Sequence, residues 1–147
     1  MIAQVFLAGP LQDQIEKEAR AAFPRECCGL AEGVREEQTV RVTAIHPARN
    51  LAAEADRFEI DPADQIRVIR TLRGTGRDIV GCYHSHPNGR AEPSERDREG
   101  AFGEDFLWLI LALAQGRDGL DATLGAFTIG PAAICEVPIA PGIIAAV

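Results

Sequence analysis

The amino-acid sequence predicts an α/β domain built on a mixed sheet with few helices. Short apolar runs with strand character recur along the chain, whereas two segments repeat their apolar residues at helical spacing. The resulting order is strand, helix, two strands, helix and strand, then a polar loop and three more strands. Because the 147 residues are 46% apolar and contain no linker-like stretch, we expect one compact domain over residues 1–147.

The first strand is expected at residues 4–9, where Gly9 and Pro10 end it. The first helix should follow over residues 11–23, because apolar side chains recur there about one helical turn apart. These side chains are Leu11, Ile15, Ala19, Ala22 and Phe23. Pro24 ends this helix, since the residue before a proline resists the α conformation.

Two strands are predicted next, at residues 27–33 and 39–47, with a charged turn between them. In the second strand Val40, Val42 and Ala44 alternate with polar residues, so we expect them to face the core. A loop then leads to the second helix.

The second helix is predicted by its end signals as well as by its spacing. Asp61 can cap the N-terminus, Pro62 suits the first turn, and Gly74 suits the position after the last turn. The apolar stripe expected on one face consists of Ile66, Ile69 and Leu72.

Four further strands complete the predicted sheet. One runs over residues 78–87, and the apolar run at 106–114 predicts a second buried strand. Residues 123–130 and 132–140 predict the last two, separated by Gly130-Pro131.

Composition excludes some function classes. A net charge of −7 disfavours binding to nucleic acid or to an anionic membrane, because both need a basic surface. The N-terminal segment lacks the pattern of a signal peptide, so we expect a cytoplasmic protein of open oligomeric state. The cysteines form no C-x-x-C pair, and we expect free thiols, with Cys27 and Cys28 on opposite faces of a strand.

The stretch YHSHPNGRAEPSERD, residues 83–97, concentrates potential metal ligands. His84 and His86 are two of only three histidines, and their spacing on an extended strand points both imidazoles to one side. Pro87 ends the strand, and the loop after it is long enough to bring Asp97 back to the same place. Two imidazoles, one carboxylate and a position for water make a typical catalytic zinc site. We therefore predict His84, His86 and Asp97 as metal ligands.

Ordinary structural roles account for parts of the same pattern. An H-x-H pair alone often binds no metal, and Ser94 could cap a short helix that has Asp97 at its third position. Ser85, between the two histidines, should face away from a metal, and His46 fits a surface or hydrogen-bonded histidine better than a ligand. The occurrence of all the parts at one strand end favours the metal site.

The segment HSHPNGRAEPSERD resembles the JAMM signature of the MPN+ zinc metalloproteases (Mov34/MPN/PAD-1 type), which is H-x-H, seven residues, Ser, two residues and Asp. PRECCGL, at residues 24–30, is similar to the P-x-E-x-C-G-L form of the stand-alone bacterial branch, as are RFEIDP and GCYHSHP. The resemblance is scattered over residues 19–108. It implies a single MPN domain, cytidine-deaminase-like, with a mixed, mostly antiparallel sheet and one zinc ion per chain.

The resemblance also implies roles for individual residues in peptide or isopeptide hydrolysis. Glu26 matches the family's glutamate, which acts as the general base. Ser94 is implied as the hydrogen-bond donor to the developing oxyanion. Asn50 resembles a recurrent asparagine near the cleft and is expected to bind substrate.

The expected substrate follows from the family and from the shortness of the chain. Family members cleave after the C-terminal glycine of ubiquitin-like proteins, and only ten residues separate His86 from Asp97, which leaves little room for an insertion that grips ubiquitin. We therefore expect a bacterial ubiquitin-like sulfur carrier of the ThiS/MoaD type, cut after its Gly-Gly tail. A small-peptide metallopeptidase or amidase, a non-catalytic MPN scaffold and a purely structural zinc site are the alternatives. The native metal stays open between zinc, iron and manganese.

Overall fold

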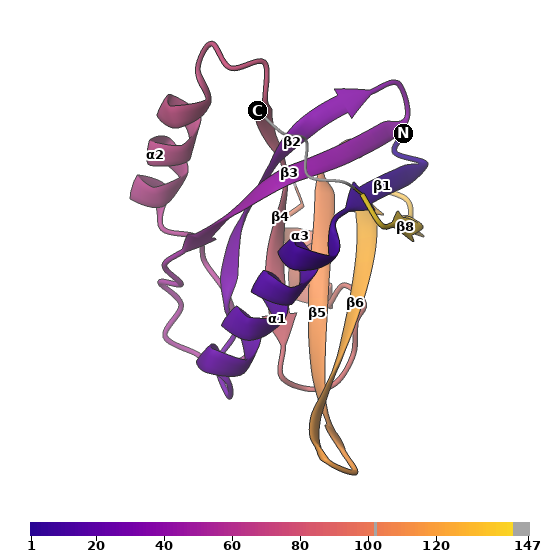
Figure 1. Cartoon of the computed structure of the whole chain (residues 1–147). Helices are drawn as coiled ribbons and strands as arrows, with labels where there is room; N and C mark the ends of the chain where they lie inside the picture. Colours follow the sequence, from indigo (N-terminus) through magenta and orange to yellow (C-terminus); the bar gives the residue numbers. More distant parts are fainter. Residues whose placement is uncertain (102, 143–147) are drawn as a thin grey trace.

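A computed structural model describes residues 1–101 and 103–142, so residues 143–147 of the predicted domain lie outside the description. In the described part, eight strands form one sheet in the order β7-β6-β5-β4-β2-β3-β1-β8 (Figure 1). The elements are β1 (Gln4–Leu7), α1 (Gly9–Ala22), β2 (Cys28–Glu36), β3 (Thr39–Ala48), α2 (Pro62–Leu72), β4 (Asp78–His86), α3 (Glu95–Glu99), β5 (Leu107–Gly116), β6 (Gly119–Ile129), β7 (Ile134–Glu136) and β8 (Ile139–Ala140). Four of the seven described strand pairings are antiparallel, which confirms the predicted α/β class.

Helix α1 begins earlier than predicted. Ala8 is extended and Pro10 lies in the first turn, so Gly9 and Pro10 open the helix instead of ending the strand. Leu11, Ile15 and Ala19 are buried as expected, whereas Phe23 follows the helix and is 37% exposed. None of the described helices has the length and apolar character that a membrane crossing requires.

Helix α2 has the predicted ends but a different buried face. Asp61 Oδ1 accepts a hydrogen bond from Ala63 N at 2.9 Å, and Gly74 has a positive φ of 74°. Val68 and Leu72, four residues apart, face the sheet. Ile66 and Ile69 were predicted on the same stripe as Leu72, but they are 49% and 44% exposed, because the short helix contacts the sheet only along the Val68–Leu72 line.

Strand β3 departs from the predicted alternation at one point. Val40 and Val42 are buried, but Ala44 is only half-buried, so its prediction was wrong. The pairing with β2 skips Thr43, since Glu32 pairs with Ala44 and the next residue pairs with Val42. This bulge moves the buried position from Ala44 to Ile45.

The C-terminal run at 132–140 forms two strands rather than the predicted one. β7 extends one end of the sheet beside β6, and β8 extends the other end beside β1. Between them Val137 N donates to Ala126 O at 2.8 Å, while Pro138 O accepts from Val5 N at 3.0 Å. Pro138 has no N–H and cannot continue the β6 ladder, so the chain changes partner there.

The two faces of the sheet have separate cores. α1 packs on one face through Ile15 and its neighbours, and α2 packs on the other through Val68 and Leu72. Alternation along β4 sends Tyr83 to the α1 core and Cys82 to the α2 core. His84 and His86 share the direction of Cys82, so the predicted metal ligands lie on the α2 face.

Glu32 is the centre of a buried polar cluster that lies away from the histidine pair. Glu32 is 7% exposed, and its carboxylate accepts hydrogen bonds from His46 Nε2 at 2.9 Å and from Arg77 Nε at 2.6 Å. Burial alone would raise the pKa of Glu32, but these hydrogen bonds lower it below its ordinary value. His46 is therefore hydrogen-bonded in a structural cluster, as expected.

We predict that Glu32→Gln lowers the free energy of unfolding by about 3 kcal/mol at pH 7, because Arg77 and His46 lose a buried charged partner. A depressed pKa means that this stabilisation is present above the ordinary value of 4.5 and is lost as the pH falls through the folded-state pKa. Urea unfolding at several pH values measures both effects. The control is Glu36→Gln, which removes an exposed carboxylate 3.9 Å from Arg41. Equal midpoints for the two variants at pH 7 would contradict the assignment.

Candidate metal centre

Strands β2 and β4 bring the predicted catalytic glutamate to the histidines. Their antiparallel register pairs Cys28 with His84, so Glu26, two residues earlier, comes level with His86, two residues later. Ser85 points to the opposite face, as expected, and there its Oγ accepts from Cys27 N at 2.8 Å. Ser85 N also donates to Cys27 O at 3.1 Å, which prolongs the pairing to Cys27, the residue that directly follows Glu26.

The three predicted ligand atoms form a nearly equilateral triangle. His84 Nε2 lies 2.9 Å from His86 Nε2, and Asp97 Oδ2 lies 3.2 Å from each of these nitrogens. Ligands about 2.0–2.1 Å from a tetrahedral zinc ion lie about 3.3 Å from one another, so the triangle fits such an ion. Glu26 joins the two histidines in a looser group, with ligand atoms within 4.8 Å of one another.

The surroundings of each imidazole fix its orientation. His86 Nδ1 donates to the carbonyl oxygen of Arg90 at 2.8 Å, so the neutral ring directs the lone pair of Nε2 into the triangle. His84 is fully buried and stacks on Phe58, with ring centroids 4.2 Å apart. Burial lowers the pKa of His84, which favours the neutral, ligating form. Two imidazole lone pairs and a carboxylate, buried together, repel one another, and a bound cation would relieve this repulsion.

Asp97 is held by the first turn of α3. Asp97 N donates to Ser94 Oγ at 3.1 Å, and Ser94 N donates to Asp97 Oδ2 at 2.8 Å, a reciprocal capping box. Burial alone would raise the pKa of Asp97, but the Nε2 groups of His84 and His86, where these carry a proton, hold it well below its ordinary value. The oxygen that caps α3, Asp97 Oδ2, is therefore the same oxygen that completes the triangle with the two histidines.

Glu26 is 7% exposed beside this triangle. Burial is the main cause that raises its pKa to about 7, with a contribution from Asp97, whereas His86 opposes the shift. A carboxyl group with such a pKa can accept and release protons near neutral pH.

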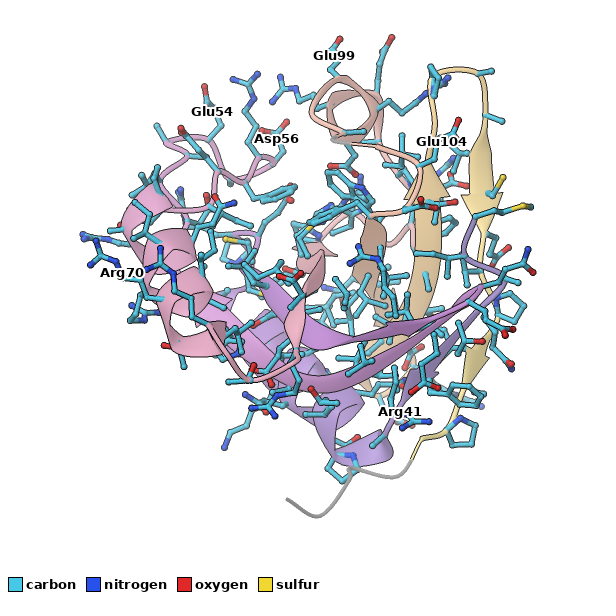
Figure 2. The ribbon with its side chains drawn as sticks, turned by 90° about the horizontal axis from the view of Figure 1, so that it is seen from above. Arg41, Glu54, Asp56, Arg70, Glu99 and Glu104 are labelled. Carbon is cyan, nitrogen blue, oxygen red and sulfur yellow. The ribbon has the colours of Figure 1, made fainter. Side chains whose placement is uncertain are left out.

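A cavity of about 600 Å³ opens onto the triangle. Its lining includes Glu26, Ser94 and Asp97 together with the aromatic side chains of Phe58, Phe106 and Trp108. Glu54 and Asp56 of the 49–61 loop and Glu99 of α3 also line the cavity, and Figure 2 shows the first two on one side and Glu99 on the other. Cys82 contributes to the lining beneath the histidines and is buried, in keeping with a core thiol.

The predicted substrate-binding residue Asn50 stands beside the cavity. Its side chain makes four hydrogen bonds of 3.0 Å to the backbone, one of them to the carbonyl oxygen of Glu26. Direct contact of Asn50 with substrate stays a prediction.

Comparison with known proteins places the chain in a family. The model of the prokaryotic homologues of the JAB domain matches residues 9–123. The chain belongs to this family.

Similar proteins extend the assignment. The desampylase of Haloferax volcanii is 36% identical over 113 residues, which are 74% of this chain and 80% of the desampylase. A probable TtuB-protein conjugate cleaving protease of Thermus thermophilus is 33% identical over 102 residues, 69% of this chain but only 62% of that protein. A solution structure of a Desulfitobacterium hafniense protein superposes with a TM-score of 0.83 at 27% identity, covering 95% of this chain and 93% of that one.

Family membership confirms the predicted JAMM resemblance and, with it, the class of JAMM-type hydrolases. Phe58 is a residue of the site that was not predicted from the sequence, although it lies in the RFEIDP motif. Its ring position on His84 depends on how the loop folds back over β4, which no local pattern indicates.

We predict that His84→Ala and Asp97→Asn bind zinc more than about 100-fold more weakly than wild type, because each loses a direct ligand. Glu26→Gln, the matched control, should bind one metal ion per chain as wild type does, since Glu26 lies outside the tight triangle. Metal titration against a competing chelator measures the affinities. A Glu26→Gln variant that loses metal as severely as Asp97→Asn would make the Glu26-His84-His86 group the ligand set instead.

Proposed function

We propose that this chain is a zinc-dependent isopeptidase that cleaves conjugates or extensions of a small ubiquitin-like protein after its C-terminal Gly-Gly. The observation that carries the proposal is the His84–His86–Asp97 triangle, which faces a buried Glu26 in an open cavity. Three protein ligands with a position left for water suit a catalytic rather than a structural zinc site.

In this proposal His84, His86 and Asp97 hold the metal. When bound, zinc would polarise a carbonyl group and lower the pKa of a bound water molecule to about 7. Glu26 takes the proton of the attacking water and delivers it to the leaving amine. Ser94 Oγ accepts from Asp97 N, so its own O–H is free to donate to the carbonyl oxygen as negative charge develops.

Two lines of evidence support an ubiquitin-like substrate. The Haloferax protein is named a desampylase, and the Thermus protein is named for cleaving TtuB-protein conjugates. The segment between His86 and α3 is short, as noted in the sequence, and carries no added element that could grip ubiquitin. A carrier of the ThiS/MoaD type in the cytoplasm fits both points. A small-peptide metallopeptidase uses the same centre and is the second candidate, because the cavity itself would accept an isolated peptide.

We predict that the zinc-loaded wild type cleaves a sulfur carrier extended beyond Gly-Gly and that Glu26→Gln loses at least about 100-fold in kcat. The loss follows from removal of the proton acceptor while the ligands stay in place. Mass spectrometry of the products locates the cut, and metal content is measured on the same samples.

Each result has one meaning. Zinc binding by both proteins without cleavage of any carrier in a panel would reject the carrier as substrate. Equal cleavage by Glu26→Gln would reject Glu26 as the base. Wild-type protein that binds no metal would favour the non-catalytic scaffold.

The exposed face of α2 separates a folded carrier from a short peptide. Gln65 lines the cavity, and Ile66 and Ile69 of the same helix are large exposed apolar side chains. We predict that the double variant Ile66→Ser/Ile69→Ser raises KM for the extended carrier by about tenfold, since each isoleucine contributes apolar contact to a docked protein body. KM for the isolated tail peptide should not change, and steady-state kinetics with both substrates measure the difference. Equal effects on both, or none, would contradict docking on α2.

A further inference from the structure

We propose that Asn50 is a positioning residue that holds Glu26 and the 49–61 loop in one fixed arrangement. The inference rests on the proposed function for its kinetic consequence, but its structural content can be measured without any substrate.

The side chain of Asn50 uses its full hydrogen-bonding capacity. Nδ2 donates to Glu26 O and to Arg57 O, both at 3.0 Å. Oδ1 accepts from Ala52 N and Glu59 N, again at 3.0 Å. Two carbonyl partners and two N–H partners leave only one orientation of the amide, so the donor and acceptor ends are assigned by the network.

These four contacts join two walls of the cavity. Ala52, Arg57 and Glu59 belong to the loop that forms one wall, and Glu26 belongs to the segment that leads into β2. The loop also carries Phe58, which stacks on His84. Asn50 therefore fixes the separation between the general base and the loop that packs on a metal ligand.

The peptide group that follows Glu26 is held at both its C=O and its N–H. Asn50 holds its carbonyl oxygen, and Ser85 holds both the N–H and the C=O of the next residue, Cys27. Because the peptide group after Glu26 is fixed at these points, the Glu26 carboxylate is restrained in where it can lie relative to His86. A base displaced by about 1 Å can lose about 100-fold in rate, so such tethers affect turnover directly.

Only an asparagine satisfies this arrangement. Asn50→Asp keeps an acceptor for Ala52 N and Glu59 N but replaces both donors with an oxygen that faces two carbonyl groups. Asn50→Ala removes all four hydrogen bonds. The two variants therefore separate the release of Glu26 from the release of the loop amides.

The matched control is Arg25→Ala. Arg25 binds the same loop, through the carbonyl oxygens of Ala52 at 2.6 Å and Ala53 at 3.3 Å, and makes no side-chain hydrogen bond to the Glu26 carbonyl oxygen. It loosens the loop while leaving the Asn50–Glu26 hydrogen bond in place.

The first experiment is NMR of the full zinc-loaded chain. Loss of a hydrogen bond shifts a carbonyl ¹³C resonance upfield, so we expect the Glu26 carbonyl signal to move upfield in Asn50→Asp and Asn50→Ala but not in Arg25→Ala. Amide exchange at Ala52 and Glu59 should accelerate in Asn50→Ala and stay slow in Asn50→Asp. An unmoved Glu26 resonance in both Asn50 variants overturns the proposal.

The second experiment is steady-state cleavage of the extended carrier. We expect kcat to fall by about 10–100-fold in both Asn50 variants, with KM within about threefold of wild type and with unchanged metal content. Arg25→Ala should keep its kcat within about threefold of wild type. A loss confined to KM would show that Asn50 acts by contacting substrate and would overturn the positioning role, as would an equal loss of kcat in Arg25→Ala.

Failure of the two ideas is distinguishable. If the wild type cleaves no carrier, the proposed function fails, and the NMR experiment still decides whether Asn50 holds Glu26.

Discussion

The hydrogen bonds between Ser85 and Cys27 are the constraint on which the site depends. They prolong the β2–β4 ladder beyond Cys28 and His84, where both strands approach their ends. Alternation along β4 then sends His84 and His86 to one face and Ser85 to the other. Ser85, which lies between the two proposed ligands, thus attaches the segment that carries Glu26 to strand β4. A one-residue slip of this register would move either the ligands or the base to the α1 face.

Asp97 illustrates how a local motif prepares a long-range site. The loop after His86 must close so that a carboxylate meets two imidazoles, which costs conformational entropy. The capping box with Ser94 orients Asp97 through backbone contacts only three residues away. Part of the ordering therefore comes from helix capping. The structure shows the capping role, and the proposed ligand role, which the sequence presented as its alternative, uses the same side chain.

The chemistry of the site was more predictable from sequence than its setting. His84, His86 and Asp97 come together as predicted, because period-two alternation and a short returning loop are local features. The orientation of α2 was not predictable, since Ile66 and Ile69 offered as good an apolar face as Val68 and Leu72 until the sheet selected one. The exchange of partners at Pro138 depends on a pairing with Val5, far along the chain. The bulge at Thr43 is a register shift inside the β2–β3 hairpin that no residue pattern marks. The four contacts of Asn50 depend on the same kind of tertiary closure.

Two buried glutamates, Glu26 just before β2 and Glu32 in its middle, show how the fold separates structure from reactivity. Glu32 and Glu26 are each 7% exposed and lie six residues apart. Glu32 meets Arg77 and His46, so its pKa is lowered and its charge is fixed. Glu26 has no ion-pair partner among the described residues, and burial raises its pKa to about 7. Burying a carboxyl group without a partner lowers the stability of the fold. Such a group is typical of a functional site, because its raised pKa lets it exchange protons at neutral pH. The contrast between one residue type in two environments favours Glu26, and not Glu32, as the proposed base.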